Sequence, residues 1–336
     1  MKKSVLAIFL SVILLMSSGV CALAADEIAL EGLEPEYYIA LQGEATDAQD
    51  DAMLLGSLSA KYESNGNPAT ISEGKDTGGV SYGAYQFSSV YGVPLAFANW
   101  CVSSGKGVVT GNTLLNAYAL DGNSYSDCFN TAWKSIAEED SAAFLLLQHE
   151  FTKARFYDVK VAKLESQIPG FKVDNYTLAL KNVIWSRTVQ QGVNSDVIFK
   201  AFENLGGFNN QKEYELIRAI YAQSSLLVNT PPTKDSIPIE RSSAEKYGID
   251  PNVVAGKYMY YYSRNSSDIQ ASVYRRLAVN ELDDALKMYE KYSGEKVPPA
   301  EPAQPEEKPT SIFSMIINIM LDLFKMFISF ILSLIG

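Results

Sequence analysis

Apolar residues recur every three or four positions through most of the chain after residue 126, and glycine or proline follows several of the runs. This period is typical of helices with one buried face. Six segments fit it, the last with Ser267 as a candidate N-cap: 126–139, 141–166, 176–191, 196–205, 213–224 and 268–292. The absence of internal repeats and of strands alternating with helices argues against a parallel α/β sheet. The sequence therefore predicts a mainly α fold.

A shorter helix and an irregular segment precede these six helices. Four apolar residues between positions 54 and 62 have helical spacing, and Gly66 can end the helix, so Glu63 is expected in or just after its last turn. Residues 67–83 have no helical period, and their glycines together with Asn67-Pro68 indicate turns. We expect a small loop or β-hairpin segment between residues 67 and 87.

The ends of the chain differ in composition from its body. A basic start, an apolar run over residues 5–16 and Ala22-Leu23-Ala24 are typical of a secretory signal peptide, predicted to cover residues 1–24. Residues 25–50 are acidic and predict a flexible spacer. Residues 294–310 contain five prolines and predict a semi-rigid linker. Residues 51–293 remain as one domain.

The last segment, residues 311–336, is almost wholly apolar and long enough to span a membrane. Its polar residues form one narrow stripe along a helix, namely Ser311, Ser314, Asn318, Asp322, Lys325, Ser329 and Ser333. A single membrane anchor is the simplest interpretation, and the stripe also suits helices that self-associate or lie in the membrane interface. We expect an exported protein, extracellular or in the cell envelope, that is anchored in a membrane at its C-terminus.

Charge, histidine and cysteine usage limit the partners. The net charge of −11 disfavours a nucleic-acid partner, which requires clustered Lys and Arg. His149 is the only histidine, and Lys153 stands where a zinc-protease motif needs a second one, which argues against a His-based zinc site or a Ser-His-Asp triad. The function inferred below needs no metal and no cofactor. Cys101 and Cys128 can form a disulfide in an oxidising compartment or remain two buried thiols.

Glu63 and Asp76 are the candidate catalytic residues. A carboxylate at a helix end, followed by a glycine-rich aromatic turn, suits the proton donor of a glycosidase, and Leu58 and Tyr62 can favour its protonated form by excluding water. Such an enzyme also needs a group that stabilises the oxocarbenium-like centre or activates water. Asp76 is the obvious second carboxylate and Glu73 its competitor. A glutamate in the last turn of a helix and a glycine-rich turn are also common in proteins where they have no catalytic role.

Short motifs spread over residues 52–292 add weight to this interpretation. They are Glu63-Ser64, Asn67-Pro68, and residues 82–87, 183–192, 274–276 and 281–286. The first three resemble the lysozyme-like superfamily of lytic transglycosylases and goose-type lysozymes, and the later ones are similar to lysozyme-like domains of phage tails and secreted wall hydrolases. Arg187 and Gln191 depart from the usual pattern, which has a small residue and often His there.

The resemblance implies roles for individual residues. Glu63 would be the general acid and Asp76 a base or water-positioning group. The sugar contacts would come from aromatic rings, which suit the apolar faces of pyranoses, and from hydrogen-bonding groups: Tyr82, Tyr85 and Gln86. Trp185 and Gln190 would be further contacts, or else core residues of an apolar helix.

The resemblance further implies a lysozyme-like domain over residues 51–293 that cleaves peptidoglycan glycan strands at the β-1,4 bond between N-acetylmuramic acid and N-acetylglucosamine. Water would attack in a muramidase and the substrate's own hydroxyl in a lytic transglycosylase, and Asp76 favours hydrolysis. A chitosanase-like glycosidase and a non-catalytic glycan-binding protein are the alternatives. A third is a wall-binding domain that delivers residues 311–336 as a membrane-disrupting helix.

Overall fold

A computed structural model describes residues 55–73, 79–229, 236–262 and 266–299. The chain divides into two compact units, Met1–Glu295 and Lys296–Gly336, and only residues 296–299 of the second are described. The predicted signal peptide, the acidic spacer, Asp76 and the apolar segment 311–336 therefore lie outside the described residues. Within the described ranges, no helix combines the length and the apolar character needed to cross a membrane.

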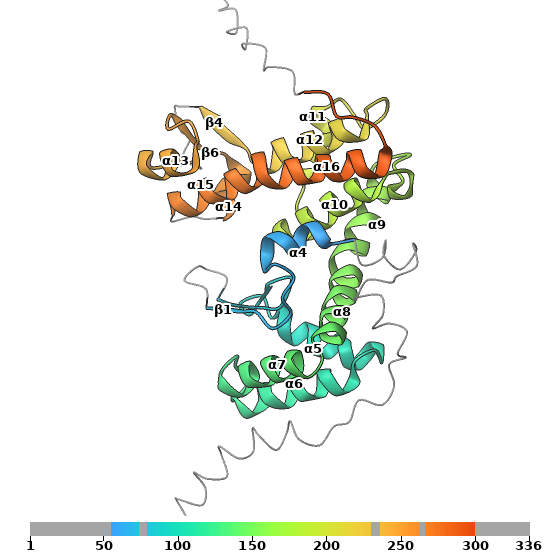
Figure 1. The fold of residues 1–336 in the computed structure, drawn as a ribbon, viewed down its shortest axis with the longest axis vertical. Coiled ribbons are helices and arrows are strands. Elements are labelled where there is room, and N and C mark those ends of the chain that lie inside the picture. Colours follow the sequence, from blue (N-terminus) through green and yellow to red (C-terminus); the bar gives the residue numbers. More distant parts are fainter. Residues whose placement is uncertain (1–54, 74–78, 230–235, 263–265, 300–336) are drawn as a thin grey trace, which may run out of the picture. The chain divides into compact units, whose positions relative to one another are not determined.

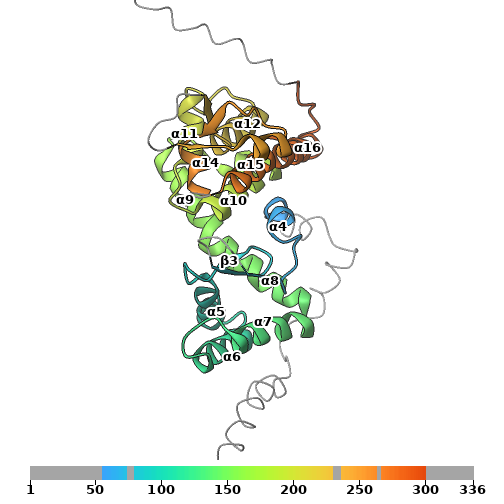
Figure 2. The same cartoon turned by 90° about the vertical axis from the view of Figure 1, so that its left-hand side faces the viewer.

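A short helix and a small sheet open the described chain. Helix α4 (Ser57–Glu63) is followed by three antiparallel strands, β1 (Ile71–Glu73), β2 (Val80–Tyr82) and β3 (Phe87–Ser88). Tyr82 pairs with Ile71 and Phe87, whereas the neighbouring Ser81 pairs with Ser72 and Ser88. In two perpendicular views this sheet lies between α4 and α5 (Figures 1 and 2). The predicted small β segment is confirmed.

Four helices follow: α5 (Val93–Ser104), α6 (Val108–Leu120), α7 (Asp127–Glu139) and α8 (Ser141–Thr152). The last two match predicted helices. The first two were outside the six predicted ranges, and they pack closely because Gly111 has no side chain. A Cβ there would lie 2.5 Å from the carbonyl oxygen of Ala98.

Cys101 lies on the buried face of α5, where its Cβ would be 3.0 Å from a Cβ at Gly111. It is a free thiol, and burial raises its pKa to about 12. Cys128 lies at the start of α7, where its N–H donates to Asp121 Oδ1 at 3.1 Å. Of the two alternatives, the disulfide between Cys101 and Cys128 is therefore excluded, because Cys101 is a free, buried thiol.

Aromatic rings form the core of this part of the molecule. Tyr82 lies 5.1 Å from Trp133 between ring centroids, and Trp133 lies 4.9 Å from Phe144, both in tilted or edge-on arrangements that aromatic pairs prefer. We call the group the aromatic cluster, and it comprises Tyr82, Phe87, Phe97, Phe129, Trp133, Phe144 and Phe151. It holds the inner face of the sheet against α5, α7 and α8.

The second half of the unit is built around α10 (Leu178–Gln191), whose residues 182–188 are all buried. Its neighbours along the chain are the π-helical turn η1 (Lys153–Tyr157), α9 (Asp158–Gln167), η2 (Val173–Asn175), α11 (Val197–Asn204) and α12 (Glu213–Ser224). The predicted helix 141–166 is thus one helical run, α8–η1–α9, interrupted by a π turn. The helices predicted at 176–191, 196–205 and 213–224 are present.

The last helical run, predicted as 268–292, is also interrupted. It consists of α15 (Ser267–Arg275), the π-helical turn η3 (Arg276–Asn280) and α16 (Glu281–Ser293). A second small sheet, not predicted from the sequence, precedes it with strand order β4 (Leu227–Asn229), β6 (Val253–Ala255), β5 (Ile237–Pro238). Helices α13 (Arg241–Tyr247) and α14 (Lys257–Tyr262) complete this region. The expectation of a mainly α fold is confirmed.

Candidate active site around Glu63

Glu63 is the last residue of α4, and the start of that helix is held tightly by α10. Asn182 Oδ1 accepts hydrogen bonds from the N–H groups of Gly56 at 2.8 Å and Leu58 at 3.3 Å, which otherwise have no partner within the helix. A Cβ at Gly56 would lie 2.7 Å from the ring of Trp185, so only glycine fits there. Asn65 and Gly66 then take left-handed conformations and turn the chain away.

The carboxylate of Glu63 is paired with an arginine. Arg276 Nη2 donates to Glu63 Oε1 at 2.8 Å, and the two side chains are 16% and 17% exposed. The guanidinium also lies over the ring of Tyr62, 5.1 Å from its centroid, in a cation–π arrangement. Glu63 is therefore partly accessible to solvent and held in one orientation from the side of η3.

Arg276 connects Glu63 to a second, fully buried carboxylate. Its Nε donates to Glu281 Oε2 at 2.6 Å. The π turn makes this contact possible, because the N–H of Glu281 bonds to the carbonyl of Arg276 five residues back and brings both side chains to one face. Burial alone would lower the pKa of Arg276, but the two carboxylates outweigh it and hold that pKa above its ordinary value.

Glu281 receives hydrogen bonds from three further groups, all on α10 or α12. Its Oε1 accepts from Arg187 Nη2 at 2.7 Å, from Tyr221 OH at 2.9 Å and from Ser186 Oγ. Burial would raise the pKa of Glu281, but Arg187 and Arg276 together hold it below its ordinary value of 4.5. This carboxylate is therefore an anion at neutral pH despite having no exposed surface.

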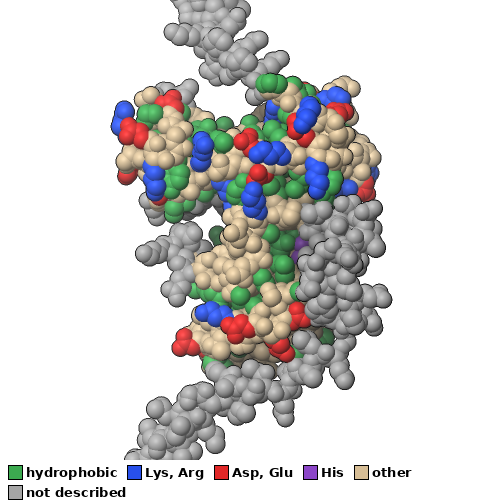
Figure 3. All heavy atoms as spheres, in the orientation of Figure 1, with side chains coloured by type: hydrophobic (Ala, Val, Ile, Leu, Met, Phe, Trp, Pro, Cys, Tyr) green, Lys and Arg blue, Asp and Glu red, His purple; other side chains and the backbone are tan. Residues whose placement is uncertain are grey.

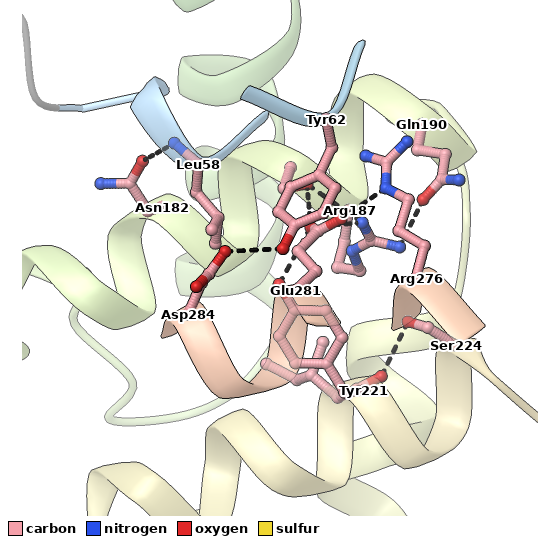
Figure 4. A network of polar contacts seen from close by, with 12 residues as sticks. Leu58, Tyr62, Asn182, Arg187, Gln190, Tyr221, Ser224, Arg276, Glu281 and Asp284 are labelled. Carbon is pink, nitrogen blue, oxygen red and sulfur yellow. Dashed lines mark hydrogen bonds and ion pairs between the residues drawn. The ribbon is translucent and has the colours of Figure 1, made fainter. Parts of the chain in front are cut away.

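Together these side chains form a charge network, which we define as Glu63, Arg276, Glu281 and Arg187 with Ser186 and Tyr221. Figure 4 labels Arg276, Glu281, Arg187 and Tyr221 of this network. Two arginines face two glutamates, so its formal charges balance. Arg187 is fully buried and also donates to Gln190 Oε1 at 2.5 Å. Glu63 is the one carboxylate of the network that reaches the surface.

A glutamine fixes the loops beyond Glu63. Gln148 Oε1 accepts from the N–H of Ala84 at 2.8 Å, and its Nε2 donates to the carbonyl of Pro68 at 3.1 Å. Gly83 has φ of 76°, and a Cβ there would lie 2.3 Å from Gln148 Oε1, so the contact requires glycine. Ser64 Oγ donates to the carbonyl of Ala84 at 2.9 Å, which ties the end of α4 to the same loop.

Three residues predicted to contact sugars are core residues in the structure. Tyr82 and Trp185 have no exposed surface, and Tyr85 is 5% exposed. The Tyr82 hydroxyl donates to Asn130 Oδ1 at 2.6 Å, and the Tyr85 hydroxyl shares a hydrogen bond with His149 Nδ1 at 2.9 Å. The structure therefore corrects the prediction that Tyr82, Tyr85 and Trp185 contact sugars directly, because tertiary packing covers their rings.

The other predicted site residues have different surroundings. Gln86 is partly exposed, has φ of 51°, and donates through Nε2 to the carbonyl of Gly83 at 3.0 Å. Gln190 accepts a hydrogen bond from Arg187 and so supports the charge network. Asp76 lies outside the described residues. Among the described residues, no three His, Cys, Asp or Glu side chains gather as a metal site would require.

Comparison with known proteins identifies the family. A family model described as type VI secretion system spike protein VgrG3-like, C-terminal, matches residues 55–231, which is more than half of the chain. The chain belongs to this family. The match includes Glu63, Gln148 and Arg187 but ends before Arg276 and Glu281, so it covers one side of the charge network.

A curated relative supports the assignment to the VgrG3-like C-terminal family. The type VI secretion system spike protein VgrG3 of Vibrio cholerae serotype O1 is 32% identical over 197 residues, or 58% of this chain. The aligned part is 18% of that relative's length. A solved structure titled "Chitosanase complex structure" is similar with 20% identity and a TM-score of 0.37, over 53% of this chain and 78% of that one.

Membership of the VgrG3-like C-terminal family corrects one sequence-based prediction. The predicted localisation, an exported protein anchored in a membrane at its C-terminus, is wrong, because the family is one of a type VI secretion spike protein. Within the described ranges, no helix could cross a membrane. The membrane contact predicted through residues 311–336, which lie outside those ranges, is corrected with it.

Proposed function

We propose that the domain described here is a glycosidase of the lysozyme-like type that cleaves the glycan strands of bacterial peptidoglycan, with Glu63 as its general acid. The observation that carries the proposal is the placement of Glu63. It ends a rigidly docked helix, remains partly accessible, and precedes a glycine-dependent turn and a small antiparallel sheet. The sequence motifs around it resemble lysozyme-like enzymes.

The charge network fixes the position of Glu63. A general acid must hold a proton and release it to the leaving glycosidic oxygen, which requires fixed geometry and a controlled charge around it. Arg276 supplies the fixed geometry through its 2.8 Å hydrogen bond to Glu63. Arg276 is also bound to Glu281, so its positive charge is shared between two carboxylates. Asp76 is proposed as the group that positions water.

The bond cleaved would be the β-1,4 bond between N-acetylmuramic acid and N-acetylglucosamine. The test is digestion of purified peptidoglycan by the full chain, by Glu63→Gln and by Glu203→Gln, with mass spectrometry of the released muropeptides. Glu203 is exposed on α11 and pairs only with Lys200 in the described contacts, so its variant is the matched control. Loss of a general acid lowers the rate by about 10²–10⁴-fold. Glu63→Gln should show this loss and Glu203→Gln should not.

The chemical ends of the released products distinguish hydrolysis from lytic transglycosylation. Reducing ends would establish attack by water, as in a muramidase, and anhydro ends would establish attack by the substrate's own hydroxyl. Cleavage of deacetylated chitosan, with none of peptidoglycan, would instead favour the chitosanase-like reading. If neither the wild type nor Glu63→Gln releases products while both bind the wall, the domain is a glycan-binding module and the proposal fails.

The family supports one partner as well. The Vibrio cholerae relative is named a type VI secretion system spike protein, and we extend that association to this chain as part of the proposal. Co-purification of the full chain with the spike proteins of its own cell tests it. Recovery of the chain without any spike component, under conditions that retain known spike complexes, would contradict this part alone.

A further inference from the structure

Tyr91 is the only exposed aromatic residue among the side chains that the structure describes. Its exposed fraction is 74%, and that of its neighbour Val90 is 60%. The chain has 20 tyrosines, 15 phenylalanines and three tryptophans, and the other aromatic side chains that the structure describes are buried or half-buried. The ring of Tyr91 is thus available for contact with another molecule.

The backbone beneath Tyr91 is fixed. The N–H of Gly92 donates to the carbonyl of Ser89 at 3.0 Å and closes a tight turn with Val90 and Tyr91 at its tip. The N–H of Ser89 donates to the carbonyl of Val80 at 2.9 Å. A Cβ at Gly79 would lie 2.8 Å from Val90 Cγ2, so the turn packs closely on the start of β2. Little backbone entropy would be lost when a ligand meets this ring.

The turn lies at the opposite end of β2 from Glu63. The loop after Glu63 joins the far end of that strand, where the N–H of Gly83 donates to the carbonyl of Thr70 at 2.7 Å and Ser64 contacts Ala84. A strand rises about 3.3 Å per residue, so the first and last residues of β2 lie about 7 Å apart. A linear glycan extending from Glu63 along the sheet would reach Tyr91 within a few sugar units.

One face of the sheet between these points offers a row of hydroxyl groups. Ser72, Ser81 and Ser88 pair across the three strands, on the face opposite the buried Tyr82 and Phe87. The space-filling view shows mainly hydrophobic and uncharged surface at the level of the sheet, while charged side chains gather above and below it (Figure 3). A surface of this kind can hydrogen-bond the hydroxyl and amide groups of a polysaccharide.

The geometry points to Tyr91 as a platform on which one sugar ring of the glycan stacks, a few units from the bond that is cleaved. The ring presents an apolar face to the C–H face of a pyranose, and Val90 extends that contact. The serine row lies between the platform and Glu63 and can hydrogen-bond sugar hydroxyls. This inference rests on the proposed function, since it takes the same glycan as the ligand, and it makes Tyr91 a determinant of preference for long strands.

The test compares Tyr91→Ala and Tyr91→Phe in the full chain, with Leu120→Ala as control. Leu120 is an apolar residue, 52% exposed, at the end of α6. Cleavage would be followed on soluble, peptide-free glycan strands sorted into long and short fractions. Stacking of this kind predicts a KM on long strands raised about tenfold by Tyr91→Ala. For Tyr91→Ala, kcat should stay unchanged and the rise in KM should be smaller on short strands. Tyr91→Phe and Leu120→Ala should have the KM and kcat of the wild type.

A binding measurement keeps this inference separate from the proposed cleavage. The same substitutions in the Glu63→Gln background would be tested by co-sedimentation with insoluble peptidoglycan, which requires no turnover. A lower bound fraction for Tyr91→Ala alone supports the platform even if the wild type proves inactive. Equal binding and equal KM for Tyr91→Ala and wild type, or an equal loss in Tyr91→Phe or Leu120→Ala, would overturn it while leaving the assignment of Glu63 untouched.

Discussion

The charge network and the aromatic cluster flank the end of α4 from two sides and stabilise it by different means. The aromatic cluster consists of neutral rings from β2, β3, α5, α7 and α8, in contact through many weak and forgiving interactions. The charge network consists of a few buried charges from α4, α10, α12 and η3–α16, each dependent on a specific partner. Packing can adjust to a changed ring, whereas a buried charge cannot do without its partner.

The difference assigns the two regions different tasks. The aromatic cluster fixes the position of the sheet and of the loop containing Gly83, and its members all lie within residues 55–231, the part matched by the family model. The charge network fixes the orientation and charge environment of one accessible carboxylate, Glu63. Two of its four charged residues, Arg276 and Glu281, come from beyond residue 231, so a chain ending there would lack them.

The largest expected effect comes from breaking the charge network at its centre. Glu281→Gln would leave Arg187 buried without an anionic partner and Arg276 with Glu63 alone, and removing one partner of a buried pair costs about 3–5 kcal/mol. The free energy of unfolding, measured by urea denaturation, should fall by that amount. Glu138→Gln, on the exposed side of α7, is the control and should leave it within about 0.5 kcal/mol. A loss below 1 kcal/mol for Glu281→Gln would show that the network is not formed.

A smaller effect is expected from the aromatic cluster. Trp133 Nε1 donates to the carbonyl of Pro68 at 2.9 Å, but that oxygen also accepts from Gln148 Nε2. Trp133→Phe therefore leaves no buried carbonyl unpaired, keeps an aromatic ring, and should cost about 1–2 kcal/mol in urea denaturation. In a Gln148→Leu background the same change leaves Pro68 without either donor and should cost more. Strict additivity of the two losses would contradict this account.

Several features of the fold follow from local sequence. The helix at 213–224 was predicted to the residue because Gly206-Gly207 ends the preceding helix and apolar residues then recur at helical spacing. The small sheet was predicted because residues 67–83 lack that spacing and are rich in glycine. The two π turns were not predicted, since one extra residue in a helical run leaves the apolar pattern on either side unchanged.

The site was predicted less completely, because most of it depends on partners distant in sequence. Glu63 was singled out from its motif, but its contact with Arg276 joins residues 213 positions apart. Arg187 was noticed only as a departure from a pattern, and its partner Glu281 shows why a large cation can be accommodated there. Tyr82 and Tyr85 looked like sugar contacts beside a glycine-rich turn, and only packing against Trp133 and His149 shows that they are covered.

The pH dependence of the free energy of unfolding should distinguish the charge network from the aromatic cluster. The pKa of Glu281 is held below its ordinary value of 4.5 in the folded protein, so the unfolded chain binds a proton first as the pH falls. The stability that Glu281 contributes is complete above pH 4.5 and declines below it, by at most about 1.4 kcal/mol per pH unit. The difference between wild type and Glu281→Gln should therefore shrink on acidification, whereas that between wild type and Trp133→Phe should stay constant. Parallel pH profiles for all three proteins would contradict the prediction.

The smallest effect is expected at the exposed rim of the charge network. Asp284 Oδ2 accepts from Lys61 Nζ at 2.5 Å and from the Tyr62 hydroxyl at 2.6 Å, but the lysine side chain is 57% exposed. Exposed ion pairs contribute about 0–1 kcal/mol because water and salt screen them, so Lys61→Met should lower the free energy of unfolding by less than about 0.5 kcal/mol. Tyr62→Phe should cost more, since Tyr62 also lies beneath Arg276 and its hydroxyl is half-buried. Both variants would be measured by urea denaturation at low and at high salt. The loss in Lys61→Met should vanish at high salt, and the loss in Tyr62→Phe should persist. A loss in Lys61→Met that does not change with salt would mean that the buried charges extend to the surface.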